Sequence, residues 1–178
     1  ALSFNLTWAL YLATETARRK GLSGYEATLW KSIQSMHDWW QWLPMESFPL
    51  LRAHDLAPYF FEWIDHPSYD AYWQRWSIER VYSRINIPAL HIGGWYDIFR
   101  DGDLRLYEGL RTHSGSEKAR ENQKLVMGPW YHNPWNRVLG TCDLGDAAAS
   151  CVDDLQERWF DYWLKGLENG IMDEPRVR

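Results

Sequence analysis

The chain has 178 residues, of which 46% are hydrophobic and 24% are charged, a length and balance typical of one folded domain or slightly more. This composition excludes an intrinsically disordered chain. The net charge of −5 and the lack of a basic block exclude the electrostatic footprint of a nucleic-acid-binding protein. No run of residues approaches the ~18 apolar positions of a membrane-spanning helix, so we expect no membrane partner.

Aromatic residues make up 16% of the chain, and 13 of them are Trp. Rings at this density often line a pocket for an apolar ligand, although they also fill bulky cores, and composition alone leaves both interpretations open. Two cysteines, Cys142 and Cys151, are too few for a disulfide framework or a four-thiolate zinc site. We expect two free thiols, a reducing cytoplasmic compartment and, because no histidine has a ligand spacing such as His-Glu-x-x-His, no metal and no cofactor.

Residues 1–84 are predicted to be helical and rich in aromatic side chains. Apolar residues at helical spacing begin near Leu6, and a basic stretch followed by Gly21 marks the end of that helix. Ser23 with Glu26 three positions later has the pattern of a capping box, which predicts a second helix running to about Trp40. Prolines further along favour short helices in the remainder of this half.

From residue 85 onward the pattern changes to short apolar runs alternating with amphipathic segments. The expected elements are a buried strand at 85–94, a helix beginning at Asp101, a polar loop at 112–123, a buried strand at 124–128, an irregular segment at 129–150 and a helix at 153–167. Alternation of strand and helix is typical of a parallel α/β sheet. Parallel sheets usually contain about five strands or more, so we expect the rest of the sheet to lie outside this chain.

Two ionisable residues follow the ends of the predicted strands. Asp97 comes after the first strand and His132 after the second. Open α/β sheets place their ligands beyond the carboxyl ends of the strands, and an α/β-hydrolase carries its triad in the order Ser, Asp or Glu, and His. Asp97 and His132 fit the last two positions. A loop carboxylate or helix cap at 97 and a loop histidine at 132 are the alternatives. The sequence contains no Gly-x-Ser-x-Gly that would supply the nucleophile.

The segments Gly-Gly-Trp-Tyr-Asp-Ile-Phe at 93–99 and Gly-Pro-Trp-Tyr-His at 128–132 closely resemble the cocaine esterase-like branch of the X-Pro dipeptidyl-peptidase-like α/β-hydrolases. The resemblance covers essentially the whole chain and extends to other Trp-bearing segments: Phe4-Asn5-Leu6-Thr7-Trp8, Trp63-Ile64-Asp65-His66-Pro67, Tyr69-Asp70-Ala71-Tyr72-Trp73 and Trp159-Phe160-Asp161-Tyr162-Trp163-Leu164-Lys165-Gly166. It implies that 1–84 is a helical cap, that 85–170 holds the last strands and helices of the hydrolase domain, and that 171–178 enters a C-terminal jelly-roll domain.

The same resemblance implies an enzyme that needs no cofactor and acts on a small ester or peptide. Asp97 and His132 match the triad, and the nucleophilic Ser and the oxyanion hole would lie in an upstream part of the same protein, so we expect this chain alone to be inactive. Trp95, Tyr96, Phe99 and Trp130 flank the pair and are expected to line the substrate pocket.

Three functions remain open on these observations. A serine hydrolase of acyl esters leads, an X-Pro dipeptidyl-peptidase of the same superfamily follows, and a non-catalytic aromatic-rich binding module is the alternative of a different class. α-Amino-acid ester hydrolases resemble this family but have acidic residues two and three positions after the triad Asp. Phe99 and Arg100 occupy those positions in this chain, which argues against that activity.

Overall fold

The computed structural model describes residues 2–132 and 136–178, and its contacts separate two compact units, Ala1–Trp76 (unit 1) and Ser77–Arg178 (unit 2). The division precedes the boundary expected after residue 84 because the segment η4 (Ile78–Arg84) packs on helix α6 (Arg100–His113). The Tyr82 hydroxyl donates to the carbonyl of Arg105 over 3.4 Å, and Glu79 forms an ion pair with the Arg105 guanidinium.

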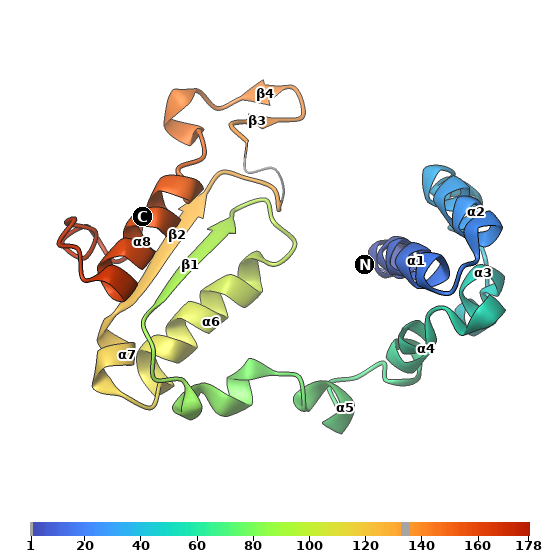
Figure 1. The fold of residues 1–178 in the computed structure, drawn as a ribbon, viewed down its shortest axis with the longest axis horizontal. Helices are drawn as coiled ribbons and strands as arrows, with labels where there is room; N and C mark the ends of the chain where they lie inside the picture. Colours follow the sequence, from blue (N-terminus) through green and yellow to red (C-terminus); the bar gives the residue numbers. More distant parts are fainter. Residues whose placement is uncertain (1, 133–135) are drawn as a thin grey trace. The chain divides into compact units, whose positions relative to one another are not determined.

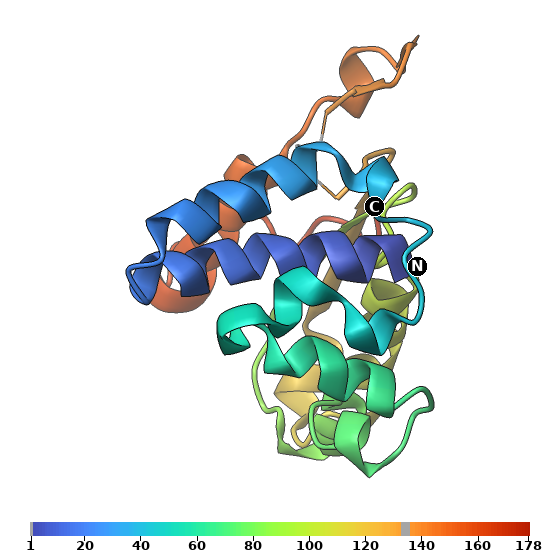
Figure 2. The same ribbon diagram turned by 90° about the vertical axis from the view of Figure 1, so that its right-hand side faces the viewer.

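The regular elements described in unit 1 are all helices. Its elements are α1 (Leu2–Arg19), α2 (Ser23–Gln34), η1 (Met36–Asp38), η2 (Met45–Ser47), α3 (Pro49–Arg52), η3 (Ala53–Asp55), α4 (Pro58–Asp65) and α5 (Ala71–Gln74). Helices α1 and α2 lie side by side, and the shorter helices follow them in the chain (Figure 2). A stripe on α1 is fully buried and consists of small or aliphatic side chains at three- and four-residue spacing: Leu6, Ala9, Leu10, Ala13 and Ala17. This stripe shares one core with Leu29, Phe48 and Phe60.

The start of α2 differs from the expected capping box. Leu22 is the N-cap residue, with no side-chain capping hydrogen bond, and its carbonyl already accepts from the backbone N–H groups of Tyr25 and Glu26. Ser23 therefore lies inside the helix, where its hydroxyl cannot serve as the N-cap acceptor. The helix also ends at Gln34 rather than near Trp40, because a separate 3-10 turn, η1, follows it.

Unit 2 is built around two parallel strands, β1 (Ala89–Gly94) and β2 (Gln123–Gly128), paired in register from Ala89 opposite Gln123 to Gly94 opposite Gly128. Its other elements are α6, α7 (Glu117–Glu121), the short strands β3 (Val138–Leu139) and β4 (Cys142–Asp143), η5 (Asp146–Ala148) and α8 (Val152–Lys165). Helices α6 and α8 flank the strand pair on opposite sides (Figure 1). The structure thus confirms the expected α/β class, mostly helical with a small parallel sheet.

The two faces of the strand pair bury different side chains. Val126 of β2 packs with Val152 and Leu155 of α8, whereas its neighbours Leu125 and Met127 pack with Tyr107 of α6. This alternation follows from the two-residue period of a strand. Because helices cover both faces, apolar side chains follow one another without alternation at Leu125, Val126 and Met127, and short apolar runs of this kind made the strands recognisable in the sequence.

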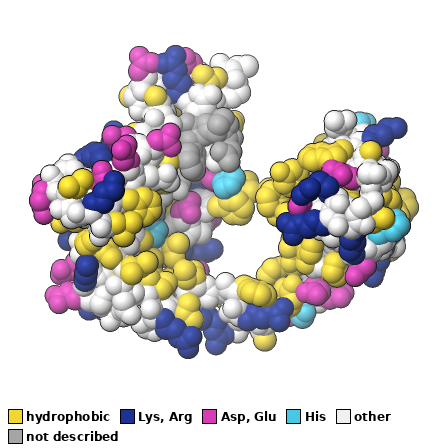
Figure 3. Space-filling view, viewed as in Figure 1, with side chains coloured by type: hydrophobic (Ala, Val, Ile, Leu, Met, Phe, Trp, Pro, Cys, Tyr) yellow, Lys and Arg dark blue, Asp and Glu magenta, His cyan; other side chains and the backbone are white. Residues whose placement is uncertain are grey.

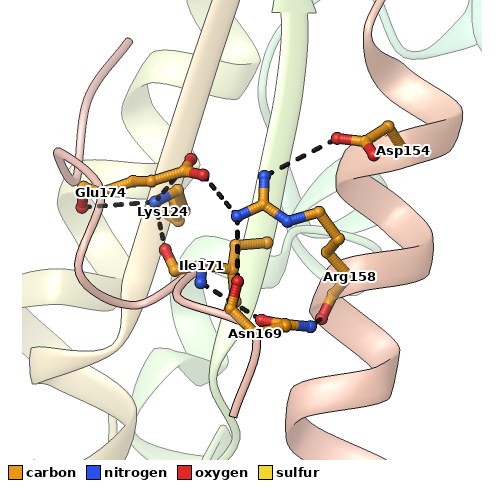
Figure 4. Close-up of polar contacts among 6 residues, drawn as sticks. All are labelled: Lys124, Asp154, Arg158, Asn169, Ile171 and Glu174. Atoms are coloured by element: carbon orange, nitrogen blue, oxygen red, sulfur yellow. Dashed lines mark hydrogen bonds and ion pairs between the residues drawn. The ribbon is translucent and has the colours of Figure 1, made fainter. Parts of the chain in front are cut away.

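The C-terminal segment pairs with the free edge of β2. Val177 forms a parallel bridge with Leu125, and the N–H groups of Leu125 and Met127 donate to the carbonyls of Arg176 and Arg178. A polar cluster holds the segment in place (Figure 4). In it, the buried Lys124 ammonium donates to the carbonyl of Ile171 over 2.7 Å and to that of Glu174 over 3.3 Å.

The remainder of the cluster joins this segment to α8. The Glu174 carboxylate accepts from the Arg158 guanidinium, and the Asn169 amide donates to the Arg158 carbonyl over 2.7 Å (Figure 4). Burial lowers the pKa of Lys124, although the charge of Glu174 opposes this effect. Segment 171–178 is therefore tied to both β2 and α8.

Two expected irregular segments contain regular structure. Helix α7 lies within the expected loop at 112–123, and Ser116 caps it by accepting from the N–H of Ala119 over 3.1 Å. The segment expected to be irregular at 129–150 contains the β3–β4 hairpin and η5. Cys142 and Cys151 are both free thiols, as expected. Within residues 2–132 and 136–178, no helix is long and apolar enough to cross a membrane.

The aromatic side chains are divided between core and surface. Among the described residues, Trp130 and Trp159 are buried, whereas six other Trp side chains are exposed, namely Trp8, Trp30, Trp40, Trp42, Trp76 and Trp95. Hydrophobic side chains are accordingly visible over both units in the face drawn in Figure 3. The high aromatic content therefore cannot be explained by core packing alone.

Candidate active site

The loops that follow β1 and β2 continue the pairing of the two strands. The N–H of Trp95 donates to the carbonyl of Gly128 over 2.9 Å, and the N–H of Tyr96 donates to the carbonyl of Trp130 over 3.1 Å. The two loops therefore run side by side where they leave the sheet. This shared exit brings the residues at 97 and 132 to one edge of the sheet, where parallel strands place functional groups.

Gly94 permits this close approach. A methyl group on its Cα would clash with the backbone carbonyl of Trp130. Any other residue would have to push the two loops apart, which would break the hydrogen bond between Tyr96 and Trp130. The second glycine of the Gly-Gly pair therefore has a specific role in holding the two loops together.

Asp97 and His132 form a hydrogen-bonded pair in which Oδ2 of the carboxylate accepts from Nδ1 of the imidazole over 2.9 Å. The other carboxylate oxygen, Oδ1, accepts from the N–H of Phe99 over 2.8 Å, and the N–H of Asp97 donates to the carbonyl of Gly94 over 3.0 Å. The carboxyl side chain is only 4% exposed, whereas the imidazole is 60% exposed. Asp97 is thus fixed within the loop, and His132 extends from it toward solvent.

This geometry selects one tautomer of the imidazole. A carboxylate can only accept, so a neutral His132 must carry its proton on Nδ1. Nε2, on the opposite edge of the ring, then holds a lone pair that can take a proton from a nearby hydroxyl. The arrangement can serve as a general base whose protonated form is stabilised by the carboxylate.

Three of the four expected pocket residues are exposed in the loop that follows β1 and carries Asp97. Trp95, Tyr96 and Phe99 each expose about half of their surface, and the Phe99 ring contacts the His132 ring edge-on with centroids 5.0 Å apart. Tyr96 contacts Tyr131 in a similar way, with centroids 6.3 Å apart. The Phe99 ring therefore places apolar surface directly against the imidazole.

Trp130 lies elsewhere than expected. Its ring is buried between the sheet and α8, against Val126 and Leu155, and its indole N–H donates to the carbonyl of Ala148 over 2.8 Å. A buried indole requires such an acceptor. Trp130 therefore belongs to the core that supports the loop after β2, and its ring does not face the exposed side of the pair.

One charged residue near the pair was not singled out from the sequence. Asp103 lies in the first turn of α6, and burial together with the charge of Asp97 raises the pKa of its carboxyl group. The helical spacing in the sequence could have identified it. Asp103 precedes the buried Tyr107 and Leu110 by four and seven positions and so lies on the inward-facing side of the helix. A carboxylate on an otherwise apolar stripe calls for an explanation.

A metal site is not apparent in the part of the chain that the structure describes. No group of three or more His, Cys, Asp or Glu side chains within 2–132 and 136–178 is arranged to hold an ion. His66, in unit 1, is paired with Asp70 over 2.6 Å and stacked on Tyr72, which gives it local structural partners.

Comparisons with known proteins identify similar sequences. Residues 2–134 match the family model described as X-Pro dipeptidyl-peptidase (S15 family). The cocaine esterase of Rhodococcus sp. (strain MB1 Bresler) is 28% identical over 139 residues, which cover 76% of this chain and 23% of that protein. Shorter matches join the chain to proteins named putative Xaa-Pro dipeptidyl-peptidase: 52% identity over 33 residues in Bacillus cereus and 73% over 22 residues in Bacillus anthracis, which are 18% and 12% of this chain and 6% and 4% of those proteins. The chain thus spans less than a quarter of the length of the curated relatives that it matches.

Proposed function

Because this chain belongs to the X-Pro dipeptidyl-peptidase (S15) family, we propose that it is part of a serine hydrolase in which Asp97 and His132 are two members of the catalytic triad. The observation that carries this proposal is the 2.9 Å hydrogen bond between a buried carboxylate and an exposed imidazole at the carboxyl ends of two parallel strands. A helix cap at 97 or an isolated loop histidine at 132 would not require the two side chains to meet.

The proposed mechanism is acyl transfer through a covalent intermediate. His132 takes the proton of a serine hydroxyl on Nε2 as the hydroxyl oxygen attacks the carbonyl carbon, and then gives that proton to the leaving group. Asp97 keeps the Nδ1 proton in place and stabilises the imidazolium that forms. Water repeats the sequence to release the acid and regenerate the serine.

The nucleophile and the oxyanion hole are proposed to come from a segment of the same protein outside these 178 residues, which contain no Gly-x-Ser-x-Gly. In this proposal residues 1–84 are the cap of the hydrolase, residues 85–170 end its sheet, and 171–178 lead into a further domain. The isolated chain then has no esterase activity that depends on His132.

We further propose that the substrate is a neutral ester with an aromatic or short acyl group. Phe99 offers apolar surface beside His132, Trp95 and Tyr96 are exposed in the same loop, and buried apolar surface contributes about 25 cal/mol per Å². The side chains two and three positions after Asp97 are Phe99 and Arg100, and neither can pair with a substrate ammonium group. An X-Pro dipeptidyl-peptidase would need an ammonium site from another part of the protein.

The test of the triad uses the full-length protein that contains this chain. A fluorophosphonate probe should label one serine, and hydrolysis of p-nitrophenyl acetate should be saturable. Asp97→Asn should lower kcat by about 10⁴-fold because an amide supports the wrong tautomer. The matched control is Asp101→Asn, which removes an exposed carboxylate paired with Arg100 and should leave kcat within about twofold. A loss of less than tenfold in Asp97→Asn would reduce Asp97 to a structural residue.

The substrate class is tested by comparing kcat/KM for p-nitrophenyl esters with kcat/KM for an Xaa-Pro-anilide. We expect the ester to be preferred, with each aromatic contact contributing a factor of roughly 10–200. Equal or better turnover of the anilide would assign the protein as a dipeptidyl-peptidase. Failure of the fluorophosphonate probe to label any serine would favour the non-catalytic binding module.

A further inference from the structure

Unit 1 contains a cavity that the proposed triad does not use. It lies where α4, the turn that follows it and α5 approach the start of α1, and its volume is about 480 Å³. Aromatic side chains form much of its wall, namely Trp63, Tyr69 and Trp73, and Asn5 and Ser68 add polar groups. A second cavity of about 380 Å³ adjoins it, because Asn5 and Trp63 line both. Apolar walls with a few polar groups are typical of small-molecule sites.

His66, which lines the first cavity, is held in one orientation by three contacts. Its Nδ1 is 2.6 Å from Oδ2 of Asp70, and one face of its ring is stacked on Tyr72 with centroids 4.3 Å apart. Its backbone carbonyl accepts from the indole N–H of Trp73 over 2.7 Å. An imidazole fixed in this way presents the same edge to the cavity at all times.

The contact with Asp70 also decides which ring nitrogen of His66 carries the proton. The hydrogen bond from His66 lowers the pKa of the Asp70 carboxyl group, which keeps it ionised at neutral pH. An ionised carboxylate can only accept, so a neutral His66 carries its proton on Nδ1 and a lone pair on Nε2. This pair in unit 1 therefore has the same hydrogen-bonding arrangement as Asp97 with His132 in unit 2.

The Nε2 atom of His66 has no hydrogen-bond partner among the residues that the structure describes. Asp70 and Tyr72, which cover Nδ1 and one face of the ring, do not line the cavity. The edge that carries Nε2 and the second face of the ring are the side-chain groups left to line it. The cavity wall thus includes a fixed hydrogen-bond acceptor, and a ligand that donates a proton would satisfy it.

The other lining groups narrow the class of ligand. Glu46, in the second cavity, is the only acidic or basic side chain other than His66 among the described residues that line either space, so an anionic ligand is disfavoured. The Trp63 and Trp73 rings suit a flat aromatic ring. Leu43 and Phe60 give the second cavity an apolar wall that suits a short alkyl group.

We propose that unit 1 binds a neutral alkylphenol whose hydroxyl donates to Nε2 of His66. Its ring lies against Trp63 and Trp73, and its alkyl group enters the second cavity. An aryl ether of the same shape has no hydroxyl proton and leaves Nε2 unpaired. The inference uses neither Asp97 nor His132, so it goes beyond the proposed function and stands or falls separately from it.

The proposal is tested first on the wild-type full-length protein by calorimetry. The two probes are 4-propylphenol and 4-propylanisole, which share the ring and the alkyl group but differ in the hydroxyl proton. The titrations are made at pH 8, where a free imidazole is neutral. The phenol should bind about tenfold more tightly than the anisole, because only the phenol can donate to Nε2. Equal Kd values for the two probes, or no binding of either, would overturn the proposal.

A variant at Asp70 tests the tautomer without removing the imidazole. Asp70→Asn can still cap α5, since its amide oxygen can accept from the N–H of Tyr72 as the carboxylate does. Its NH₂ group can donate to Nδ1 of His66, which moves the ring proton to Nε2 and turns the acceptor into a donor. The preference for the phenol should then disappear. A preference that survives in Asp70→Asn would contradict the assignment of the hydroxyl to Nε2.

The matched control is Asp38→Asn, which alters a carboxylate paired with the exposed His37 in the same unit. It should keep the wild-type preference for the phenol, because neither residue lines the two cavities. An equal loss of preference in Asp38→Asn and Asp70→Asn would show a general effect of charge and overturn the proposal.

His66→Phe separates this site from any other that binds phenols. The new ring can still stack on Tyr72 but has no acceptor, so the phenol and the anisole should bind equally. Unchanged phenol binding in His66→Phe would place the ligand elsewhere and refute the site. A protein with the expected binding pattern in which the fluorophosphonate probe labels no serine would keep the phenol site and lose the hydrolase assignment. An active hydrolase that binds both probes equally would keep the triad and lose the phenol site.

Discussion

Unit 1 and unit 2 bury their side chains in different ways. Unit 1 has one continuous apolar core, and its buried polar side chains Thr14 and Ser32 donate only to carbonyls of their own helices among the described residues. Unit 2 divides its core across a strand pair and buries Gln123 and Lys124, which bond to segments distant in the sequence. Buried polar groups that reach other segments fix positions, whereas an apolar core mainly supplies stability. The candidate active site lies in unit 2, where buried polar groups hold distant segments of the chain in fixed positions.

The largest effect is expected in the core of unit 1. Phe60→Ala should lower the free energy of unfolding of that unit by about 3–5 kcal/mol, because Phe60 is almost fully buried and its removal leaves a cavity. Phe160→Ala, on the exposed face of α8, is the matched control and should cost less than about 1 kcal/mol. Hydrogen exchange monitored by NMR should show faster exchange in α1 and α2, with the β1 and β2 amides unchanged. Faster exchange of the β1 and β2 amides in Phe60→Ala would show that the two units do not unfold separately.

A smaller loss of stability, confined to unit 2, is expected at Gly94. Gly94→Ala places a methyl group against the Trp130 carbonyl, and such overpacking typically costs about 1–3 kcal/mol. The NMR signals of Asp97 and His132 should shift as the two loops separate. Gly102→Ala is the control, because nothing lies near its Cα in α6 and alanine favours a helix by up to about 1 kcal/mol. A Gly94→Ala variant as stable as the wild type would mean that the two loops can separate freely.

The smallest effect concerns acid pH and the C-terminal segment. Burial opposes ionisation of Glu174, but the Arg158 guanidinium and the Lys124 ammonium together outweigh it and lower the pKa of the carboxyl group. The ionised Glu174 carboxylate therefore contributes its full stabilisation above the ordinary carboxyl pKa of about 4.3. This stabilisation is lost as the pH falls through the lowered pKa that the group has in the folded state. Glu174→Gln should cost about 1 kcal/mol at neutral pH and remove this part of the acid sensitivity.

The measurement is exchange of the Leu125 and Met127 amides, which donate to the C-terminal segment. The protection factors of these amides, which are corrected for the intrinsic pH dependence of exchange, should be lower in Glu174→Gln than in the wild type at pH 7. In the wild type they should decrease as the pH falls below about 4. Glu108→Gln, an exposed residue of α6, should change neither. Equal behaviour of the two variants would show that the polar cluster does not hold the segment.

The strand pair and the contact between Asp97 and His132 could both be predicted from the sequence. Apolar runs ending in glycine predicted β1 and β2, and the parallel-sheet rule placed the residues after them at one edge. The position of the Trp130 ring could not be predicted from the sequence, because it is set by the Ala148 carbonyl, 18 residues away, and by the helix α8. The capping box at Ser23 failed for a local reason, since the preceding carbonyl of Leu22 begins the helix.

The central claim is that Asp97 holds His132 with its proton on Nδ1 and its lone pair on Nε2. The direct measurement is a ¹⁵N NMR correlation of the two ring nitrogens of His132, recorded above the pH at which the ring loses its second proton. We predict that Nδ1 has the chemical shift of a protonated, pyrrole-type nitrogen and Nε2 that of an unprotonated one, and that Asp97→Asn abolishes this preference. A proton on Nε2 in the wild type, or equal populations of both tautomers, would contradict the account.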